Sequence, residues 1–190
     1  PGWTVMALVP NLRGAEAALA AGAHKLTLPV SASEAHSLAN VRKTPLAMVE
    51  QVRTIAALRQ AQAPGVGLEV GISTAFGCTL QGVVPEDDVV RLAVACAEAG
   101  ADEVGLSDTV GYANPAQVRR LFRRLRAELG DKAGAAHMHN TRGLGLANCL
   151  AAWEEGTRTF DASQGGLGGC PYAPGASGNV VTEDLVFMFE

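Results

Sequence analysis

The sequence has few aromatic residues, no long apolar run and no excess of positive charge. Phe, Trp and Tyr make up 5% of its 190 residues, and the formal net charge is −4. Because nucleic-acid binding requires a basic stripe or patch, we expect no nucleic-acid partner. No apolar run reaches the roughly 18 residues that a membrane-spanning helix needs, so we expect no membrane partner.

The sequence also lacks an initial methionine and a regular cysteine pattern. It begins at Pro1, which predicts that the natural N-terminus lies upstream. The spacing of Cys78, Cys96, Cys149 and Cys170 fits neither a disulfide scaffold nor a Cys-x-x-Cys metal site. We therefore interpret them as reduced thiols of a cytoplasmic protein. Two of them, Cys96 and Cys149, fall within helical patterns and are predicted to be small core residues.

Short apolar runs alternate with amphipathic stretches along the whole chain, which we interpret as a single domain over residues 1–190. The predicted strands lie at 5–9, 24–30, 67–74, 102–108, 134–140 and 157–163. Helical patterns follow each of them, and those after the second strand run from Ser31 to about Ala63. Alternating strands and helices indicate a parallel sheet. Six such units fit either a doubly wound sheet or part of a (β/α)₈ barrel, and the pattern alone does not choose between them.

Glycine and proline mark the predicted ends of the helices. Gly22, Gly100 and Gly156 each stand between a helical pattern and the next strand, as a C-terminal cap does. Pro85 and Pro115 stand at predicted helix starts, where a missing N–H costs nothing. These positions support the repeated strand–helix unit.

Two histidines on one predicted strand are candidate metal ligands. His137 and His139 are two residues apart, so their side chains point to the same face of the strand. Two imidazoles in that arrangement can hold one metal ion. The alternative is a pair of unrelated histidines, one of them buried and hydrogen-bonded.

Asp108 follows another predicted strand at the same relative point. A carboxylate there can bind a metal, orient a histidine or transfer a proton. The alternative is that Asp108 caps a turn or a helix.

The segment 160–179 surrounds Cys170 with glycines and ends on Asn179. Its spacing does not fit a phosphate-binding glycine motif, and its Cys, Leu and Tyr residues are unusual for a solvated linker. Glycines on both sides of Cys170 allow a mobile loop to bring a thiol to a ligand for proton transfer. The amide oxygen of Asn179 is a candidate cation ligand. A packed structural loop with an inert cysteine remains the alternative.

Residues 163–179 resemble the cysteine loop of 3-hydroxy-3-methylglutaryl-CoA lyases, and the strand AHMHN resembles the metal-binding strand of the same family. Further segments that resemble the family in the same order are 10–23, 77–82, 106–111 and 178–188. The resemblance implies a (β/α)₈ TIM barrel of which this chain holds about six β–α units. It also implies a homodimer and a divalent cation, Mg²⁺ or Mn²⁺, held by His137, His139 and Asn179.

The implied reaction is the retro-Claisen cleavage of an acyl-CoA thioester such as 3-hydroxy-3-methylglutaryl-CoA to acetyl-CoA and acetoacetate. In this interpretation His137 and Asp108 take part in proton transfer, and Cys170 protonates the enolate. The family's Arg-Asp segment on the first strand is absent here, so the chain alone is expected to be inactive. The alternatives are a condensing acyltransferase of the isopropylmalate or homocitrate synthase type and a non-catalytic homologue.

Four positions depart from the family pattern. Gln164 and Gly165 replace the commoner Val-Ala of the cysteine loop, and Asn140 replaces the aspartate after the histidine pair. Gly71 takes the place of a tyrosine and is expected to widen the pocket. These departures bear on the acyl group of the substrate more than on the type of reaction.

Overall fold

The computed structural model describes residues 2–169 and 178–190. Among these residues, six strands form one parallel sheet whose order in space is their order in the chain. They are β1 (Met6–Leu8), β2 (Lys25–Ser31), β3 (Gly67–Ser73), β4 (Glu103–Asp108), β5 (Ala133–Met138) and β6 (Phe160–Asp161). All six predicted strands are present, but β6 is much shorter than its predicted range.

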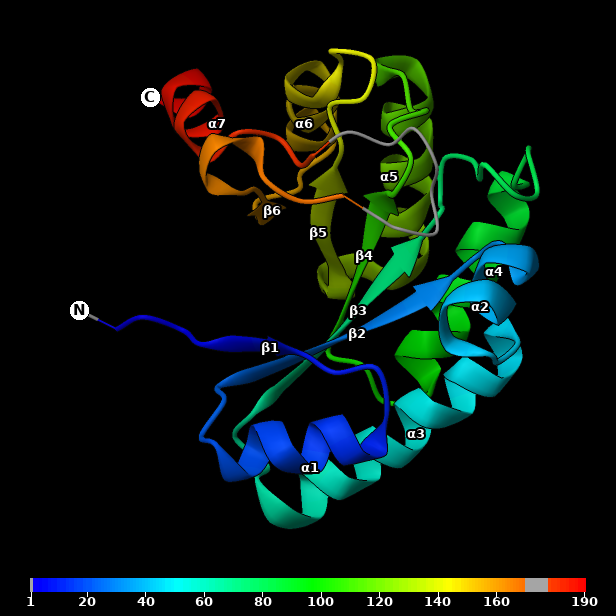
Figure 1. Ribbon diagram of the computed structural model, residues 1–190, viewed down its shortest axis with the longest axis vertical. Helices are drawn as coiled ribbons and strands as arrows, with labels where there is room; N and C mark the ends of the chain where they lie inside the picture. Colours follow the sequence, from blue (N-terminus) through cyan, green and yellow to red (C-terminus); the bar gives the residue numbers. More distant parts are fainter. Residues whose placement is uncertain (1, 170–177) are drawn as a thin grey trace.

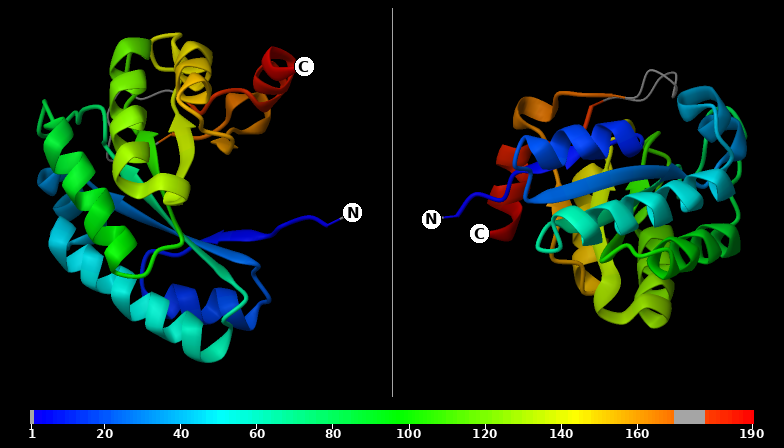
Figure 2. Two further views of the ribbon diagram at one scale, coloured as in Figure 1. Left: turned by 180° about the vertical axis from the view of Figure 1, so that it is seen from behind. Right: turned by 90° about the horizontal axis from the view of Figure 1, so that it is seen from below.

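The helices of the repeated units cover one face of the sheet and leave the other face open (Figures 1 and 2). They are α1 (Leu12–Ala20), α3 (Pro45–Gln62), α4 (Glu86–Glu98), α5 (Pro115–Leu129) and α6 (Gly145–Glu154). The remaining short elements are α2 (Glu34–Val41), η1 (Gly130–Lys132), η2 (Gln164–Gly166) and α7 (Thr182–Phe189). A doubly wound sheet carries helices on both faces and reverses its strand order, so that alternative is wrong. The architecture is a partial (β/α)₈ barrel.

The alternation of side chains along each strand separates the core from the open face. In β3, the side chains of Leu68, Val70 and Ile72 are fully buried under the helices. Between them, Glu69 and Gly71 point to the opposite side and line a cavity. Successive residues of a strand point to opposite faces, so a single strand supplies both the hydrophobic core and the wall of the cavity.

The predicted glycine caps are confirmed. Gly22, Gly100 and Gly156 have φ angles of 81°, 109° and 94°. After α4, the N–H of Gly100 donates to the carbonyl of Ala97 and the N–H of Ala101 donates to that of Cys96, both at 3.2 Å. These two bonds define a Schellman motif, and the same pair of bonds follows α1 and α6. The motif turns the chain from the end of a helix into the next strand.

The helical patterns after the second strand form two helices. Arg42 adopts a left-handed conformation (φ 56°) and ends α2. Thr44 then caps α3 by accepting the N–H of Ala47 at 3.2 Å, and Pro45 occupies the first turn. The predicted helix starts are also confirmed, since Pro85 is the N-cap residue of α4 and Pro115 is in the first turn of α5.

Two of the thiols are core residues, as predicted. Cys96 in α4 and Cys149 in α6 are fully buried, and burial raises the pKa of each thiol to about 12. Such thiols are unreactive at neutral pH. None of the helices within the described ranges is long and apolar enough to cross a membrane.

Candidate active site

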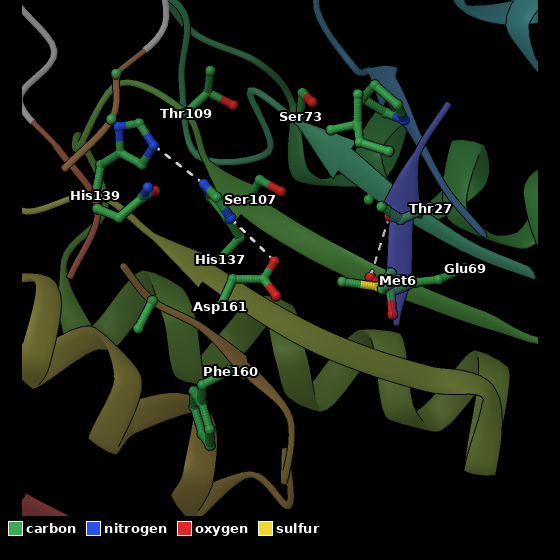
Figure 3. Close-up of a pocket in the computed structure, with 17 residues that line it drawn as sticks. Met6, Thr27, Glu69, Ser73, Ser107, Thr109, His137, His139, Phe160 and Asp161 are labelled. Atoms are coloured by element: carbon green, nitrogen blue, oxygen red, sulfur yellow. Dashed lines mark hydrogen bonds and ion pairs between the residues drawn. The ribbon is translucent and has the colours of Figure 1, made fainter. Parts of the chain in front are cut away.

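The imidazoles of His137 and His139 lie side by side on the open face of β5 and the residue after it (Figure 3). Their Nε2 atoms are 3.2 Å apart, and their ring centroids are 5.2 Å apart. The arrangement predicted from the spacing of two residues is therefore present. Two imidazole nitrogens that each bind one ion at about 2.0–2.1 Å are separated by roughly 3.0–3.4 Å, which includes the observed distance.

Asp161 contacts the other ring nitrogen of His137. The two residues are paired across β5 and β6, and the carboxylate Oδ2 lies 3.1 Å from Nδ1 of the imidazole (Figure 3). Asp161 was not among the site residues predicted from the sequence. The available signal was its place at the end of the last predicted strand, which is the same relative position that singled out Asp108.

Asn179 is brought beside the histidines by backbone pairing. The N–H of Asn140 donates to the carbonyl of Gly178 and the N–H of Val180 donates to that of Met138, both at 3.1 Å. This pairing sets Asn179 opposite His139 in an antiparallel bridge. The structure therefore places the two imidazoles and the amide at the same end of the sheet.

The side chain of Asn179 has one satisfied and one unsatisfied group. Its amide nitrogen donates to the carbonyl of Leu167 at 2.9 Å. Its Oδ1 atom is buried and accepts no hydrogen bond from the described residues. Because burying an acceptor without a partner costs about 1–3 kcal/mol, the oxygen is suited to a ligand that the protein alone does not supply.

The glycines on both sides of Cys170 allow the chain to pack closely around Asn179. A Cβ atom at Gly178 would overlap the carbonyl oxygen of Gly166. At Gly168, which has a φ of 106°, a Cβ atom would lie 2.8 Å from the amide nitrogen of Asn179. Glycine is therefore required at both positions. Cys170 itself lies outside the described residues, so its predicted delivery by a mobile loop stays a prediction.

Asp108 is buried at the end of β4 and is held by the turn that follows. Its Oδ1 and Oδ2 atoms accept the N–H groups of Tyr112 (2.8 Å) and Ala113 (3.1 Å). Burial raises the pKa of the carboxyl to about 6, although these hydrogen bonds and a charge on His137 act to lower it. Its neighbours in sequence, Ser107 and Thr109, line the cavity, whereas Asp108 does not. The turn-cap alternative thus accounts for its direct contacts.

The open face encloses a cavity of about 610 Å³. The histidines lie at one end, near the carboxyl ends of the strands. Near the opposite end, Lys25 pairs with Glu69 at 2.6 Å and with Glu103 at 2.8 Å. Burial acts to lower the pKa of Lys25, but the hydrogen bonds to both glutamates outweigh it and raise the pKa. The amine therefore stays charged, and the two ends of the inner face differ in their chemistry.

The candidate cation ligands are two imidazoles and one amide. Within residues 2–169 and 178–190, no group of three or more histidine, cysteine, aspartate or glutamate side chains is arranged to hold a metal. A site at His137 and His139 consequently depends on the buried Oδ1 of Asn179 as its third donor. Imidazole nitrogen and amide oxygen suit borderline and hard divalent ions.

Residues 4–190 match the sequence model of the HMGL-like family. The chain belongs to the HMGL-like family. It is 44% identical to the hydroxymethylglutaryl-CoA lyase of Bacillus subtilis, an alignment that covers 100% of this chain and 62% of the relative. It is also 42% identical to the (R)-citramalyl-CoA lyase of Chloroflexus aurantiacus, with 96% and 57% covered. Both of these relatives are named as acyl-CoA lyases.

Solved structures of HMGL-like proteins share the fold of the chain. The HMG-CoA lyase of Acinetobacter baumannii, in complex with coenzyme A and 3-methylmalate, is 43% identical and superimposes with a TM-score of 0.91. The alignment covers 97% of this chain and 60% of that protein. The Bacillus subtilis enzyme gives a TM-score of 0.90 at 42% identity, with 98% and 62% covered. The chain thus spans about 60% of the length of these HMGL-like relatives.

Proposed function

We propose that the gene product containing this chain is a metal-dependent retro-Claisen lyase. Its substrate is 3-hydroxy-3-methylglutaryl-CoA or a close 3-hydroxyacyl-CoA, and its products are acetyl-CoA and acetoacetate or a related keto acid. The observation that carries the proposal is the convergence of His137, His139 and Asn179 at one end of the cavity. The lyase names of the relatives support the reaction type, and coenzyme A bound to one of them supports a thioester substrate.

The residues present fit a divalent cation, Mg²⁺ or Mn²⁺. The Nε2 atoms of His137 and His139 and the Oδ1 atom of Asn179 would hold it, and the unsatisfied buried oxygen is the direct structural reason. When bound, the cation supplies Lewis-acid polarisation and holds the substrate oxygens in place.

The remaining steps are assigned to side chains of this chain. The substrate's tertiary hydroxyl group loses its proton to water, the C2–C3 bond breaks, and its electron pair forms the enolate of acetyl-CoA. His137 assists by holding the cation through Nε2, because its Nδ1 faces Asp161. The thiol of Cys170 then donates a proton to C2 of the enolate, and solvent returns a proton to the resulting thiolate. Asp108 does not line the cavity, so we assign it a positioning role: it accepts N–H groups of the turn after β4, next to Ser107, which does line the cavity.

The proposal is tested by the release of acetyl-CoA from 3-hydroxy-3-methylglutaryl-CoA and from citramalyl-CoA, with and without Mg²⁺ or Mn²⁺. The wild-type gene product that contains this chain should cleave at least one thioester only when the cation is present. His139→Ala should abolish the stimulation by the cation. Cys170→Ala should lower kcat by on the order of 10²–10⁴-fold, which is the usual contribution of a general acid, without weakening cation binding. Cleavage that persists undiminished in Cys170→Ala would contradict the role of the loop.

A matched control is available in His24. This histidine precedes β2, and its Nδ1 accepts the backbone N–H of Val5. His24→Ala should leave the stimulation by the cation intact, because the residue lies outside the cavity lining. Equal losses in His24→Ala and His139→Ala would indicate a general effect on folding.

Two other outcomes would identify the alternatives. Condensation of acetyl-CoA with a keto acid, without cleavage of either thioester, would indicate an acyltransferase. Absence of both reactions and of cation binding would indicate a non-catalytic homologue. The homodimer and the cytoplasmic location stay predictions that rest on resemblance and composition.

A further inference from the structure

We infer that Asp161 is a positioning residue that fixes the tautomer of His137. Its carboxylate accepts a hydrogen bond from the Nδ1–H group of His137, which leaves the lone pair of Nε2 directed at His139 and the cation site. The role in cation binding rests on the proposed function. The hydrogen bond itself does not, because it is present without a cation.

The geometry selects one tautomer. A neutral imidazole carries its proton on one ring nitrogen and a lone pair on the other. An ionised carboxylate only accepts hydrogen bonds, so the contact of 3.1 Å between Asp161 and Nδ1 of His137 requires the proton to be on Nδ1. The Nε2 atom, 3.2 Å from Nε2 of His139, is then left as an acceptor or a ligand. This arrangement is the usual one for a histidine that binds a metal.

The surroundings hold the carboxylate in place. The residue before it, Phe160, packs its ring 5.2 Å from that of Phe189 in α7, which in turn lies 6.0 Å from the ring of Trp153 in α6. The N–H of Ala136 donates to the carbonyl of Thr159 at 3.0 Å, which joins β6 to β5. Phe160 thus anchors the two-residue strand β6 to the helices, and Asp161, the second residue of β6, faces the cavity (Figure 3).

Asp161 has no competing cation nearby. In the described part of the chain its carboxylate makes no ion pair with a lysine or an arginine, and its partner is Nδ1 of His137. About a third of each of the two side chains is exposed, so the pair borders the open cavity. A carboxylate whose role was only to hold the fold together would be expected to pair with backbone N–H groups, as Asp108 does.

The first test is the tautomer itself, measured without any cation. Nitrogen-15 NMR of the metal-free protein, well above the ordinary histidine pKa of about 6.5, distinguishes Nδ1–H from Nε2–H imidazole. We expect His137 to be the Nδ1–H form in the wild type and to lose this preference in Asp161→Ala. Asp161→Asn keeps an acceptor oxygen and should retain part of the preference for the Nδ1–H form. It also keeps the shape of the side chain, so it serves as the test variant if Asp161→Ala folds poorly. An unchanged tautomer of His137 in Asp161→Ala would overturn the inference.

The second test is the affinity for Mn²⁺, measured by calorimetry or EPR. Loss of the carboxylate partner should weaken binding about 10–100-fold, because removal of such partners usually costs that much. The control is Asp131→Ala, an exposed aspartate in η1 that should leave the affinity unchanged. Equal affinities in wild type and Asp161→Ala would contradict the inference while leaving the lyase proposal intact. A wild-type protein that binds no Mn²⁺ but has the Nδ1–H tautomer would instead overturn the proposed function and support the hydrogen bond.

Discussion

The outer and inner faces of the sheet differ in chemistry although their residues alternate along the same strands. At the end of β4, Leu106 is buried under the helices, whereas its neighbour Ser107 lines the cavity. In β5, Met138 is fully buried between two cavity-facing histidines, His137 and His139. The outer face is mostly apolar, so it specifies the fold through a simple pattern. The inner face carries serine, glutamate and imidazole groups, which no simple hydrophobic pattern specifies.

The largest expected effect comes from replacing, one at a time, two adjacent residues that face opposite sides of the sheet. Leu106→Ala should lower the free energy of unfolding by about 2–5 kcal/mol, because it leaves a cavity in the core. Ser107→Ala should change it by less than about 0.5 kcal/mol, since the side chain faces open space. Urea titrations of both variants measure the difference. The kinetic effects should be reversed, with a raised KM for Ser107→Ala and a nearly unchanged KM for Leu106→Ala. Similar losses of stability in the two variants would contradict the assignment of faces.

Asp108, a buried carboxyl next to the cavity-lining Ser107 and Thr109, should make the free energy of unfolding depend on pH. Its pKa is about 6 in the folded protein and 3.8 ordinarily, so the unfolded chain releases this proton at lower pH than the folded protein does. Folding therefore becomes less favourable as the pH rises from about 4 to 6, by up to about 3 kcal/mol. Asp108→Asn lacks this loss but gives up an acceptor for the N–H groups of Tyr112 and Ala113. The variant should be less stable than wild type near pH 4, and the deficit should shrink or reverse by pH 7.5.

The comparison is made from urea unfolding of both proteins at the two pH values. All other titrating groups are shared, so the difference between the proteins isolates Asp108. A deficit that stays constant with pH would show that burial does not raise this pKa.

The smallest expected effect is at Gly71 on the inner face. A Cβ atom there would lie 3.6 Å from the Oγ of Ser107, which is ordinary contact. Gly71→Ala should therefore leave the fold intact and stabilise it by up to about 1 kcal/mol, because glycine weakens strand interiors. It should lower kcat/KM for substrates with a large group on C3 more than for the methyl substrate. Steady-state kinetics with both substrates measure the change in kcat/KM for each. An equal change for both would show that the group on C3 does not lie beside Gly71.

The elements of the outer face were predictable because burial on one side imposes a period on the sequence. The strand at 67–74 and the glycine caps at Gly22 and Gly100 follow from local pattern and backbone chemistry alone. The boundary at Arg42 between the helices after the second strand was not predicted, although Thr44 and Pro45 carried the signal of a new helix start.

The site could be predicted only in part. Spacing identified His137 and His139, because two residues on one strand share a face whatever the rest of the fold does. Asp161 was missed because its role depends on the pairing of β6 with β5, which is a contact between distant segments. The short length of β6 was missed for the same reason. Only two of its residues pair with β5, although the strand pattern of the sequence extends over residues 157–163. The contacts of Asp108 likewise depend on a turn that sequence alone leaves open.

The central claim is that two imidazoles and one amide oxygen hold a single divalent cation. The most direct measurement is the anomalous diffraction of crystals grown with Mn²⁺. We predict one manganese peak bonded to the Nε2 atoms of His137 and His139 and to the Oδ1 atom of Asn179, each at roughly 2.0–2.4 Å. A peak that is bound by the histidines without Asn179, or no peak at the histidines at saturating Mn²⁺, would contradict the account.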